Sequence, residues 1–491
     1  MIHQRPHRTF LGALAAGMLL LGASAWAAPP STTPKPNIVI MFIDDMGYGD
    51  IGPFGNKVNQ TPHLDRMAEE GMVLTQFYVA NTACTPSRAA LLTGTYAHRI
   101  GMDGPVVFPG DKRGLNPNEI TIAEMLRKNG YATGCFGKWH LGDQPEFMPL
   151  AQGFDSYFGI PYSNNMWSGK KGRKYSALPV MKQDKAVAYV ADEMDQSLLA
   201  EVITDEAIEF IKEHQKQPFF CYIPHSHVHR PRYARPEYLK RAEGNVDRAH
   251  VEEVDDSIGR VLQTLRDLKL DQNTLVIFTS DNGGARGMSM GPLRGGKNGP
   301  KYEGHMRVPT LAWWPGTIPG GITTKEIGVT TDLLPTLAKL TNAQFPTDRI
   351  IDGKEITGIL LGKKEAKSPH HVLFYEDEGI RRGDWKLVKI TESGESNRES
   401  KKDLGGAHPK KVEESKKGKA KLELYDLSTG LGEKTDLART HPERVEELDR
   451  LLKEHASSIA ANLRPAGFAK NPKPILKEVG DLPTLKQYLV K

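Results

Sequence analysis

The sequence predicts an α/β protein with a large, mostly parallel central sheet flanked by helices, followed by a smaller C-terminal α+β subdomain. Short apolar runs that suit buried strands alternate with longer helical patterns, which is typical of a largely parallel sheet. A change of composition after about residue 365 predicts the smaller unit. The 491 residues are sufficient for one large and one small unit with ample core.

The strongest strand predictions are residues 37–43 and 274–279. Both are continuous apolar runs, as expected for strands that are covered on both faces. A helical pattern over residues 61–71 follows the first strand, and another over residues 251–268 precedes the second. This order predicts a main domain over residues 37–368.

The C-terminal subdomain, residues 369–491, is predicted to hold a short antiparallel sheet and a packed amphipathic helix around residues 445–459. Residues 396–421 are rich in Lys, Glu, Ser and Gly without an apolar period, so we interpret them as a solvated loop. The lysines of residues 410–421 could also attract a polyanionic glycan. The predicted strands are residues 372–375, 385–390 and 422–425.

Residues 1–27 have the pattern of a secretory signal peptide. Arg5 and Arg8 precede an apolar run over residues 10–21, and a small-x-small cleavage pattern follows. An uncleaved anchor is the competing interpretation, but the run is short for a membrane span. We therefore expect a periplasmic or secreted protein with residues 28–36 as a linker and no stable membrane span after cleavage.

Charge and cysteine content favour neither a nucleic-acid-binding protein nor a disulfide-rich one. The formal charge of +5 includes Arg5 and Arg8, which leaves +3 after cleavage and does not predict nucleic-acid binding. Three cysteines in an exported chain are an odd, sparse set and do not imply a disulfide framework. Cys135 and Cys221 lie in apolar, strand-like runs, so we expect them to be core thiols.

Oxygen ligands occur where the two strongest strands end. Asp44 and Asp45 follow one strand, and Asp281 and Asn282 follow the other. Because ligands bind at the carboxyl ends of strands in open α/β sheets, these side chains are expected to converge on one site. Three carboxylates and a carboxamide suit Ca²⁺, with Mg²⁺ as the alternative, rather than zinc. Turn and cap residues are the alternative interpretation.

The segment Cys84-Thr-Pro-Ser-Arg88 is the most informative stretch of the chain. Pro86 suits the first turn of a helix through residues 89–92, and the N-terminus of a helix stabilises anions. Arg88, one turn after Cys84, can reach the same anion. The alternative interpretation of Cys84 is an ordinary buried thiol.

Together with the acidic strand ends, this segment resembles sulfatases of the alkaline phosphatase-like superfamily, and most closely the arylsulfatase A and N-acetylgalactosamine-6-sulfatase group. Six blocks occur in the family order, and the likeness covers roughly residues 37–390. The blocks are residues 42–50, the Cys84 segment, and residues 130–142, 219–231, 279–283 and 293–297.

The resemblance implies that a formylglycine-generating enzyme oxidises Cys84 to Cα-formylglycine, whose hydrated aldehyde is the nucleophile. It also implies a metal, with Ca²⁺ preferred. Asp50 lies in the first block but is not implied as a ligand. The implied ligands are Asp44, Asp45, residue 84, Asp281 and Asn282; Arg88, Lys138 and Lys297 would hold sulfate, His140 would take a proton from the diol, and His229 would assist the leaving alcohol.

Two lysines compete for the last sulfate-binding role. The chain departs from the family pattern between Lys297 and Glu303-Gly-His305, where it carries an extra residue. Lys301 is therefore the alternative to Lys297. We prefer Lys297 because Leu293-Arg-Gly-Gly precedes it.

Candidate substrate contacts lie in two further segments. His225, His227 and His229 alternate after a predicted strand; a zinc cluster is conceivable, but alternate residues of an extended segment share a face and are expected to line one pocket. A polar loop supplies amides and an aromatic ring, a combination that commonly holds sugars, although a turn-rich surface loop is the alternative. The loop candidates are Asn164, Asn165 and Trp167.

The sequence thus predicts an exported, calcium-dependent sulfatase that hydrolyses sulfate monoesters through a covalent sulfate intermediate. A sulfated carbohydrate is the expected substrate. One alternative is a phosphonate or phosphate monoester hydrolase of the same superfamily. Another is a non-catalytic relative that binds sulfated glycans, which is expected if residue 84 stays a thiol.

Overall fold

The computed structural model describes residues 1, 34–168, 175–390, 420–476 and 478–490. Residues 35–491 form one compact unit, and residues 1–34 are a separate one. Nearly all of the predicted signal peptide, linker and solvated loop lie outside the described residues. Among the residues that are described, no helix is both long enough and apolar enough to cross a membrane.

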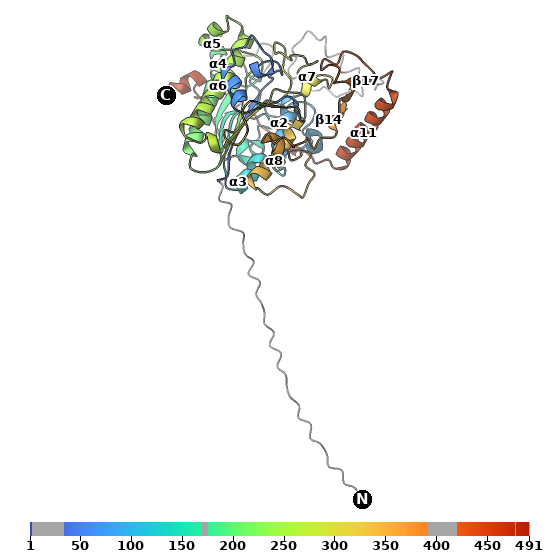
Figure 1. The fold of residues 1–491 in the computed structure, drawn as a ribbon. Coiled ribbons are helices and arrows are strands. Elements are labelled where there is room, and N and C mark those ends of the chain that lie inside the picture. Colours follow the sequence, from blue (N-terminus) through green and yellow to red (C-terminus); the bar gives the residue numbers. More distant parts are fainter. Residues whose placement is uncertain (2–33, 169–174, 391–419, 477, 491) are drawn as a thin grey trace. The chain divides into compact units, whose positions relative to one another are not determined.

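A ten-stranded sheet forms the centre of the unit of residues 35–491 (Figure 1). Its five middle strands, β10, β1, β9, β5 and β6, run parallel, so their carboxyl ends lie at one edge. Antiparallel pairing starts on both flanks, at β11 and β7. In spatial order the strands are β12 (Ile322–Thr324), β2 (Met72–Leu74), β11 (Leu311–Trp313), β10 (Thr274–Ser280), β1 (Asn37–Ile43), β9 (Phe219–Pro224), β5 (Ala132–Lys138), β6 (Ser156–Ile160), β7 (Leu178–Lys182) and β8 (Lys185–Val190).

Helices cover both faces of this sheet (Figure 1). Ile40 and Phe42 of β1 belong to a core with α2, α3 and α8, whereas Val39 and Met41 belong to a core with α1, α4 and α6. Burial on both faces explains why β1 is apolar from Ile38 to Ile43. The predicted α/β class is confirmed. The helices are α1 (Pro62–Glu70), α2 (Cys84–Thr93), α3 (Ile122–Lys128), α4 (Glu193–Glu213), α6 (Val246–Asp267) and α8 (Leu333–Thr341).

The C-terminal part forms the predicted small antiparallel sheet with a packed helix. Leu448 and Leu452 of α11 (Pro442–Ala461) pack against Ile380, Leu387 and Leu424 of the sheet. The strand β15 was not predicted, and the boundary near residue 368 stays a prediction. The sheet order is β14 (Leu373–Tyr375), β15 (Gly379–Arg382), β16 (Trp385–Ile390) and β17 (Lys421–Asp426).

Short elements complete the described unit. Residues of α5 pack on α6, and α7 follows the segment that carries Lys297 and Lys301. The remaining α-helices of the described residues are α5 (Pro236–Arg241), α7 (Glu303–Met306), α9 (Thr357–Leu360) and α12 (Leu485–Leu489), and the paired short strands are β3 (Phe77–Tyr78) with β13 (Gly328–Val329) and β4 (Arg113–Gly114) with β18 (Gly467–Phe468).

A buried charge network joins the small sheet to α7. Lys386 of β16 places Nζ 2.9 Å from Oε1 of Glu303 and 3.0 Å from Oε1 of Glu433. The Tyr375 hydroxyl donates to Glu303 at 2.6 Å, and Arg307 lies 3.4 Å from the same carboxylate. Since Lys386 and Glu303 have fully buried side chains, this network fixes the small sheet against the segment that leads to Lys297.

Candidate active site

The carboxyl ends of the parallel strands bring the acidic residues together. β1 and β10 are paired in register from Asn37 with Thr274 to Ile43 with Ser280, so Asp44 and Asp281 follow side by side. The Asp45 N–H donates to Oδ1 of Asp281 at 3.1 Å. Asp45 has a φ of +64°, a left-handed backbone that is uncommon outside glycine and is enriched at functional sites.

Cys84 is the first residue of α2 and is almost completely buried. Its Sγ lies 3.2 Å from Nζ of Lys297 and 3.4 Å from Oδ1 of Asp44. Burial and the nearby Asp44 carboxylate raise the pKa of the Cys84 thiol to about 12. The thiol is therefore protonated at neutral pH, and a protonated thiol is a poor nucleophile.

The acidic group has the chemistry of a divalent cation site. Ligand atoms of Asp44, Asp45, Cys84 and His229 all lie within 4.8 Å of one another. Asn282 donates its amide to Asp45 at 2.8 Å, while its buried Oδ1 has no hydrogen-bond partner among the described residues. An unpaired amide oxygen beside converging carboxylates fits a hard cation such as Ca²⁺ or Mg²⁺.

Arg88 bridges the strand ends from inside the protein. Its Nη2 lies 2.9 Å from Oδ2 of Asp281 and 3.6 Å from Oδ2 of Asp44. Its Nη1 donates to the Lys138 carbonyl at 2.8 Å. Burial raises the pKa of Asp281 to about 7, with Asp44 adding to the effect and Arg88 opposing it.

Two lysines add positive charge to the same group. Lys138 Nζ lies 2.5 Å from Oδ2 of Asp44 and donates to the Ser163 hydroxyl at 3.1 Å. Lys297 Nζ lies 2.5 Å from Oδ1 of Asp45. With Arg88, these lysines balance the three carboxylates, so a bound divalent cation would leave the site positive and suited to an anionic substrate.

A glycine aligns Lys138 with this group. Gly137 has a φ of +137°, and a Cβ at this position would lie 2.1 Å from the Pro224 carbonyl oxygen. Only glycine tolerates both the backbone conformation and the close approach of β5 to β9.

Lys301 lies in a different environment from Lys297. Its Nζ is 2.9 Å from Glu376, 3.6 Å from Glu378 and 3.2 Å from the Thr82 hydroxyl. Thr82 precedes the nucleophile segment, so Lys301 supports that segment, whereas Lys297 contacts Cys84 itself.

Two histidines border the charged group. His140 follows Lys138 by two residues and hydrogen-bonds through Nε2 to the Val107 carbonyl at 3.1 Å. His229 lies 3.7 Å from Asp45 through Nε2 and 2.9 Å from Asn164 Oδ1 through Nδ1. Burial lowers the pKa of His140 well below its usual value, with Lys138 adding to the effect. Neutral His140 is therefore available as a base.

The structure does not bring His225 and His227 to Cys84. His225 Nε2 lies 2.9 Å from the Ser257 hydroxyl, and His227 Nε2 lies 3.3 Å from Glu253, both partners belonging to α6. His227 also stacks on His250 with ring centroids 4.0 Å apart. The three alternating histidines thus have separate partners, which does not favour a zinc cluster.

The loop candidates are largely engaged within the protein. Asn164 contacts His229, and its Nδ2 also approaches the Pro231 carbonyl at 3.3 Å. Trp167 is 4% exposed and meets Tyr233 edge to face. Asn165 is only partly buried, although its Oδ1 is buried without a partner among the described residues. Of the three loop residues, Asn165 is therefore the most accessible.

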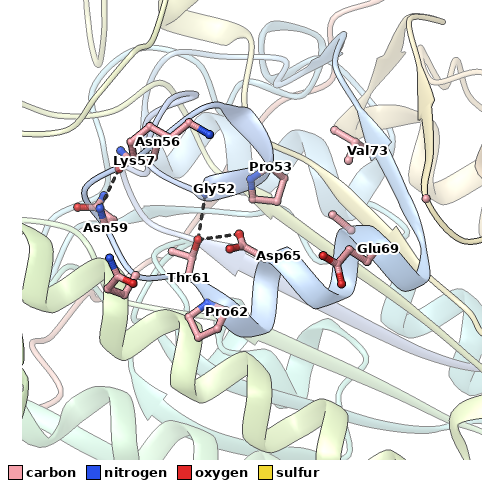
Figure 2. A pocket seen from close by; sticks show the side chains of 13 residues that line it. Gly52, Pro53, Asn56, Lys57, Asn59, Thr61, Pro62, Asp65, Glu69 and Val73 are labelled. Carbon is pink, nitrogen blue, oxygen red and sulfur yellow. Dashed lines mark hydrogen bonds between the residues drawn. The ribbon is translucent and has the colours of Figure 1, made fainter.

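An open pocket of about 580 Å³ lies elsewhere, on the loop after β1 and the start of α1 (Figure 2). The Thr61 hydroxyl accepts from the Gly52 N–H at 2.9 Å and donates to Asp65 at 3.1 Å. None of the predicted site residues lines this pocket. Its lining includes Gly52, Pro53, Asn56, Lys57, Asn59, Thr61, Pro62, Asp65, Glu69 and Val73.

Two residues of the candidate site were not predicted from the sequence. The Ser163 hydroxyl oxygen lies 3.1 Å from Nζ of Lys138 and 3.5 Å from Nδ1 of His229. Ser163 directly precedes the predicted loop residue Asn164, but nothing in the sequence singled it out. Thr85 belongs to the motif itself, yet its partners lie far along the chain. Its position beside Cys84 was the one signal that could have identified it.

Comparison with known proteins finds a matching family model and similar relatives. The sulfatase family model matches residues 36–343. N-acetylgalactosamine-6-sulfatase of Canis lupus familiaris is 37% identical over 388 residues, covering 74% of this chain and 72% of that protein. Arylsulfatase A of Homo sapiens is 38% identical over 415 residues, covering 78% of each chain.

Solved structures agree with the fold as well. The crystal structure of Ps i-CgsB superposes with a TM-score of 0.73 at 27% identity, covering 88% of this chain and 95% of that chain. The resemblance found in the sequence is confirmed by these relatives and by the family match. The chain therefore belongs to the sulfatase family, within the alkaline phosphatase-like superfamily, and is a sulfuric ester hydrolase.

Proposed function

We propose that this sulfatase hydrolyses sulfate esters of a carbohydrate through a formylglycine derived from Cys84. The observation that carries the proposal is the environment of Cys84, which is surrounded by Lys297, Asp44 and the first turn of α2. A thiol with a pKa near 12 is a weak nucleophile there, whereas the hydrated aldehyde offers two hydroxyls.

The metal proposed for this site is Ca²⁺, with Mg²⁺ as the alternative. Asp44, Asp45, Asp281, Asn282 and an oxygen of residue 84 would hold it, and the cation would supply positive charge that favours the ionised diol. The donor set consists of oxygens, which supports a hard cation over zinc.

The side chains around residue 84 have proposed roles in ester cleavage. Arg88, Lys138 and Lys297 hold the sulfate oxygens and neutralise charge that develops as the ester bond breaks. His229, protonated on both ring nitrogens when the substrate is bound, donates the proton of Nε2 to the departing alcohol. The alcohol leaves, and sulfate stays bound covalently to residue 84 until His140 takes the proton of the remaining hydroxyl.

A sulfated saccharide is the proposed substrate. Ps i-CgsB, at 27% identity, has also been solved in complex with k-i-k-neocarrahexaose. The relatives named above act on sulfate esters by name. The names of these relatives support removal of sulfate from glycans. The signal-like N-terminus supports a periplasmic or secreted enzyme that acts outside the cytoplasm.

Sulfate release from a panel of sulfated mono- and oligosaccharides tests the proposal. The protein is co-expressed with a formylglycine-generating enzyme, and the mass of the peptide containing residue 84 reports conversion. We expect release from at least one sugar, loss of activity after chelation, and recovery with Ca²⁺. Removal of the cation takes away the positive charge that favours the ionised diol, so the nucleophile is not activated.

Matched phosphate and phosphonate esters form the comparison arm. Faster hydrolysis of these esters than of the sulfates would contradict the proposal and favour the phosphoester alternative. Saccharide binding without turnover by fully converted protein would favour the non-catalytic alternative. Recovery with Mg²⁺ but not Ca²⁺ would overturn only the choice of metal.

A further inference from the structure

A closed circuit of hydrogen bonds holds the His140 ring. The Thr85 hydroxyl donates to the His140 carbonyl at 2.9 Å and accepts from the Val107 N–H at 3.2 Å. The Val107 carbonyl in turn lies 3.1 Å from Nε2 of His140. All three residues are at most 2% exposed, so water does not compete for these bonds.

The circuit determines the tautomer of His140. A backbone carbonyl only accepts hydrogen bonds, so Nε2 of His140 must carry the hydrogen that it donates to Val107. In the neutral ring, Nδ1 then holds the lone pair. Nδ1 is buried and has no hydrogen-bond partner in the part of the chain that the structure describes. This leaves one ring nitrogen as the proton acceptor.

We propose that Thr85 is a positioning residue that, through Val107, keeps Nδ1 of His140 as the base of the second reaction step. This inference rests on the proposed function. In that step the O–H bond of the residue 84 hemiacetal breaks and its proton passes to Nδ1. The freed electron pair forms the aldehyde C=O bond, and the C–O bond to sulfate breaks, releasing sulfate with that bonding pair.

Thr85→Val removes the hydroxyl with little change of shape. We expect kcat to fall roughly 10- to 100-fold, because a misplaced or wrongly protonated base slows sulfate release. KM should fall with kcat, since kcat/KM reports formation of the covalent sulfate and is unaffected. Intact-protein mass spectrometry during turnover should show accumulation of enzyme carrying one sulfuryl group.

The controls separate this role from folding and maturation. Rates are expressed per converted residue 84, because Thr85 lies in the maturation motif. Thr85→Ser should retain near wild-type behaviour. Thr93→Val removes another buried hydroxyl of α2, which donates to the Ala89 carbonyl at 2.8 Å, and should leave kcat and KM unchanged.

Two results would overturn the proposal. One is wild-type kinetics in converted Thr85→Val; the other is a loss confined to kcat/KM without accumulation of sulfated enzyme. If Thr85→Val escapes conversion, Val107→Pro removes the N–H donor of the circuit from outside the motif, and the same two outcomes apply. An inactive but fully converted wild type would instead refute the proposed function.

An independent set of contacts determines the tautomer of His229. Nδ2 of Asn164 approaches the Pro231 carbonyl at 3.3 Å and Gln196 Oε1 at 3.4 Å. Because these groups accept, the amide oxygen of Asn164 must face His229, and Nδ1 of that ring must donate to it at 2.9 Å. In the protonated ring the second N–H is then on Nε2, which lies toward Asp45 and the site.

The geometry points to Asn164 as a positioning residue for His229, rather than as the sugar contact predicted from the sequence. Asn164→Ala should slow hydrolysis of a sugar sulfate roughly 10- to 100-fold, since proton donation to the alcohol is weakened. An aryl sulfate with an acidic phenol needs less proton donation, so its kcat/KM should fall much less.

Asn37→Ala is the matched control, because Asn37 is also buried but lies at the amino end of β1. It should affect both substrates equally and weakly. Equal losses on the sugar and aryl sulfates in Asn164→Ala would contradict the role. A rise in KM for the sugar sulfate alone, with kcat unchanged, would instead indicate that Asn164 contacts the sugar.

Discussion

Cys84→Ser is expected to abolish turnover and to leave at most a single sulfation of the protein. Serine fits the same buried place beside Lys297 and Asp44 but offers one hydroxyl, so a sulfate transferred to it cannot be expelled by a second. Losing a group on which the whole reaction depends typically lowers kcat by about 10⁴- to 10⁶-fold. Free sulfate released under excess substrate measures the loss.

Intact mass spectrometry shows whether inactive Cys84→Ser still carries out the first step or no step at all. A stable sulfuryl adduct shows that the first step survives, whereas Cys84→Ala should acquire none. Cys221→Ser is the matched control, because Cys221 is an equally buried free thiol in β9. Sustained turnover by Cys84→Ser, or loss of activity in Cys221→Ser without unfolding, would refute the assigned nucleophile.

Lys386→Met is expected to have the largest effect on stability. The substitution removes the ammonium group that lies between the buried carboxylates of Glu303 and Glu433. Removing one partner of a buried ion pair typically lowers the free energy of unfolding by about 3–5 kcal/mol, because an uncompensated charge stays buried. Urea unfolding followed by tryptophan fluorescence at neutral pH measures the change.

The size of the loss should depend on which partner is removed and on pH. Glu303→Gln should lower the unfolding free energy less than Lys386→Met does, because Lys386 still pairs with Glu433. Burial opposes ionisation of Glu303, but Lys386 and Arg307 hold its pKa well below the usual value. The ionised Glu303 carboxylate therefore adds to the unfolding free energy at neutral pH, and this stabilisation is lost as the pH falls. The difference in unfolding free energy between Lys386→Met and the wild type should then become smaller in acid.

An exposed ion pair provides the control for Lys386. Arg450 lies 2.7 Å from Glu454 on α11, and both side chains are more than half exposed. Arg450→Met should change the unfolding free energy only slightly, since solvent already screens that pair. Equal losses of unfolding free energy in Arg450→Met and Lys386→Met would show that the buried network stabilises the fold no more than an exposed ion pair does.

The order of residues along the chain was sufficient to predict the centre of the fold. Strands covered on both faces are mostly apolar, so β1 and β10 were recognisable as nearly continuous apolar runs. The acidic residues after them were expected to meet because parallel strands end at one edge. The antiparallel flanks and β15 were not predicted, since such short strands depend on neighbours for their pairing.

The nucleophile segment was also predictable, because its residues lie within one helical turn of one another. Folding was needed wherever partners are distant in sequence. Lys297 and Lys301 share one loop, and only packing separates a contact with Cys84 from contacts with Glu376 and Thr82.

Composition likewise did not separate the histidines. His225 and His227 are directed to α6, while His229 is directed to Asp45. The hydrogen bonds of Thr85 and Asn164 that orient the two site histidines join residues far apart in the chain. Residue types and strand ends therefore predicted which chemistry the protein carries, and long-range packing decided which atom of each side chain faces the reaction.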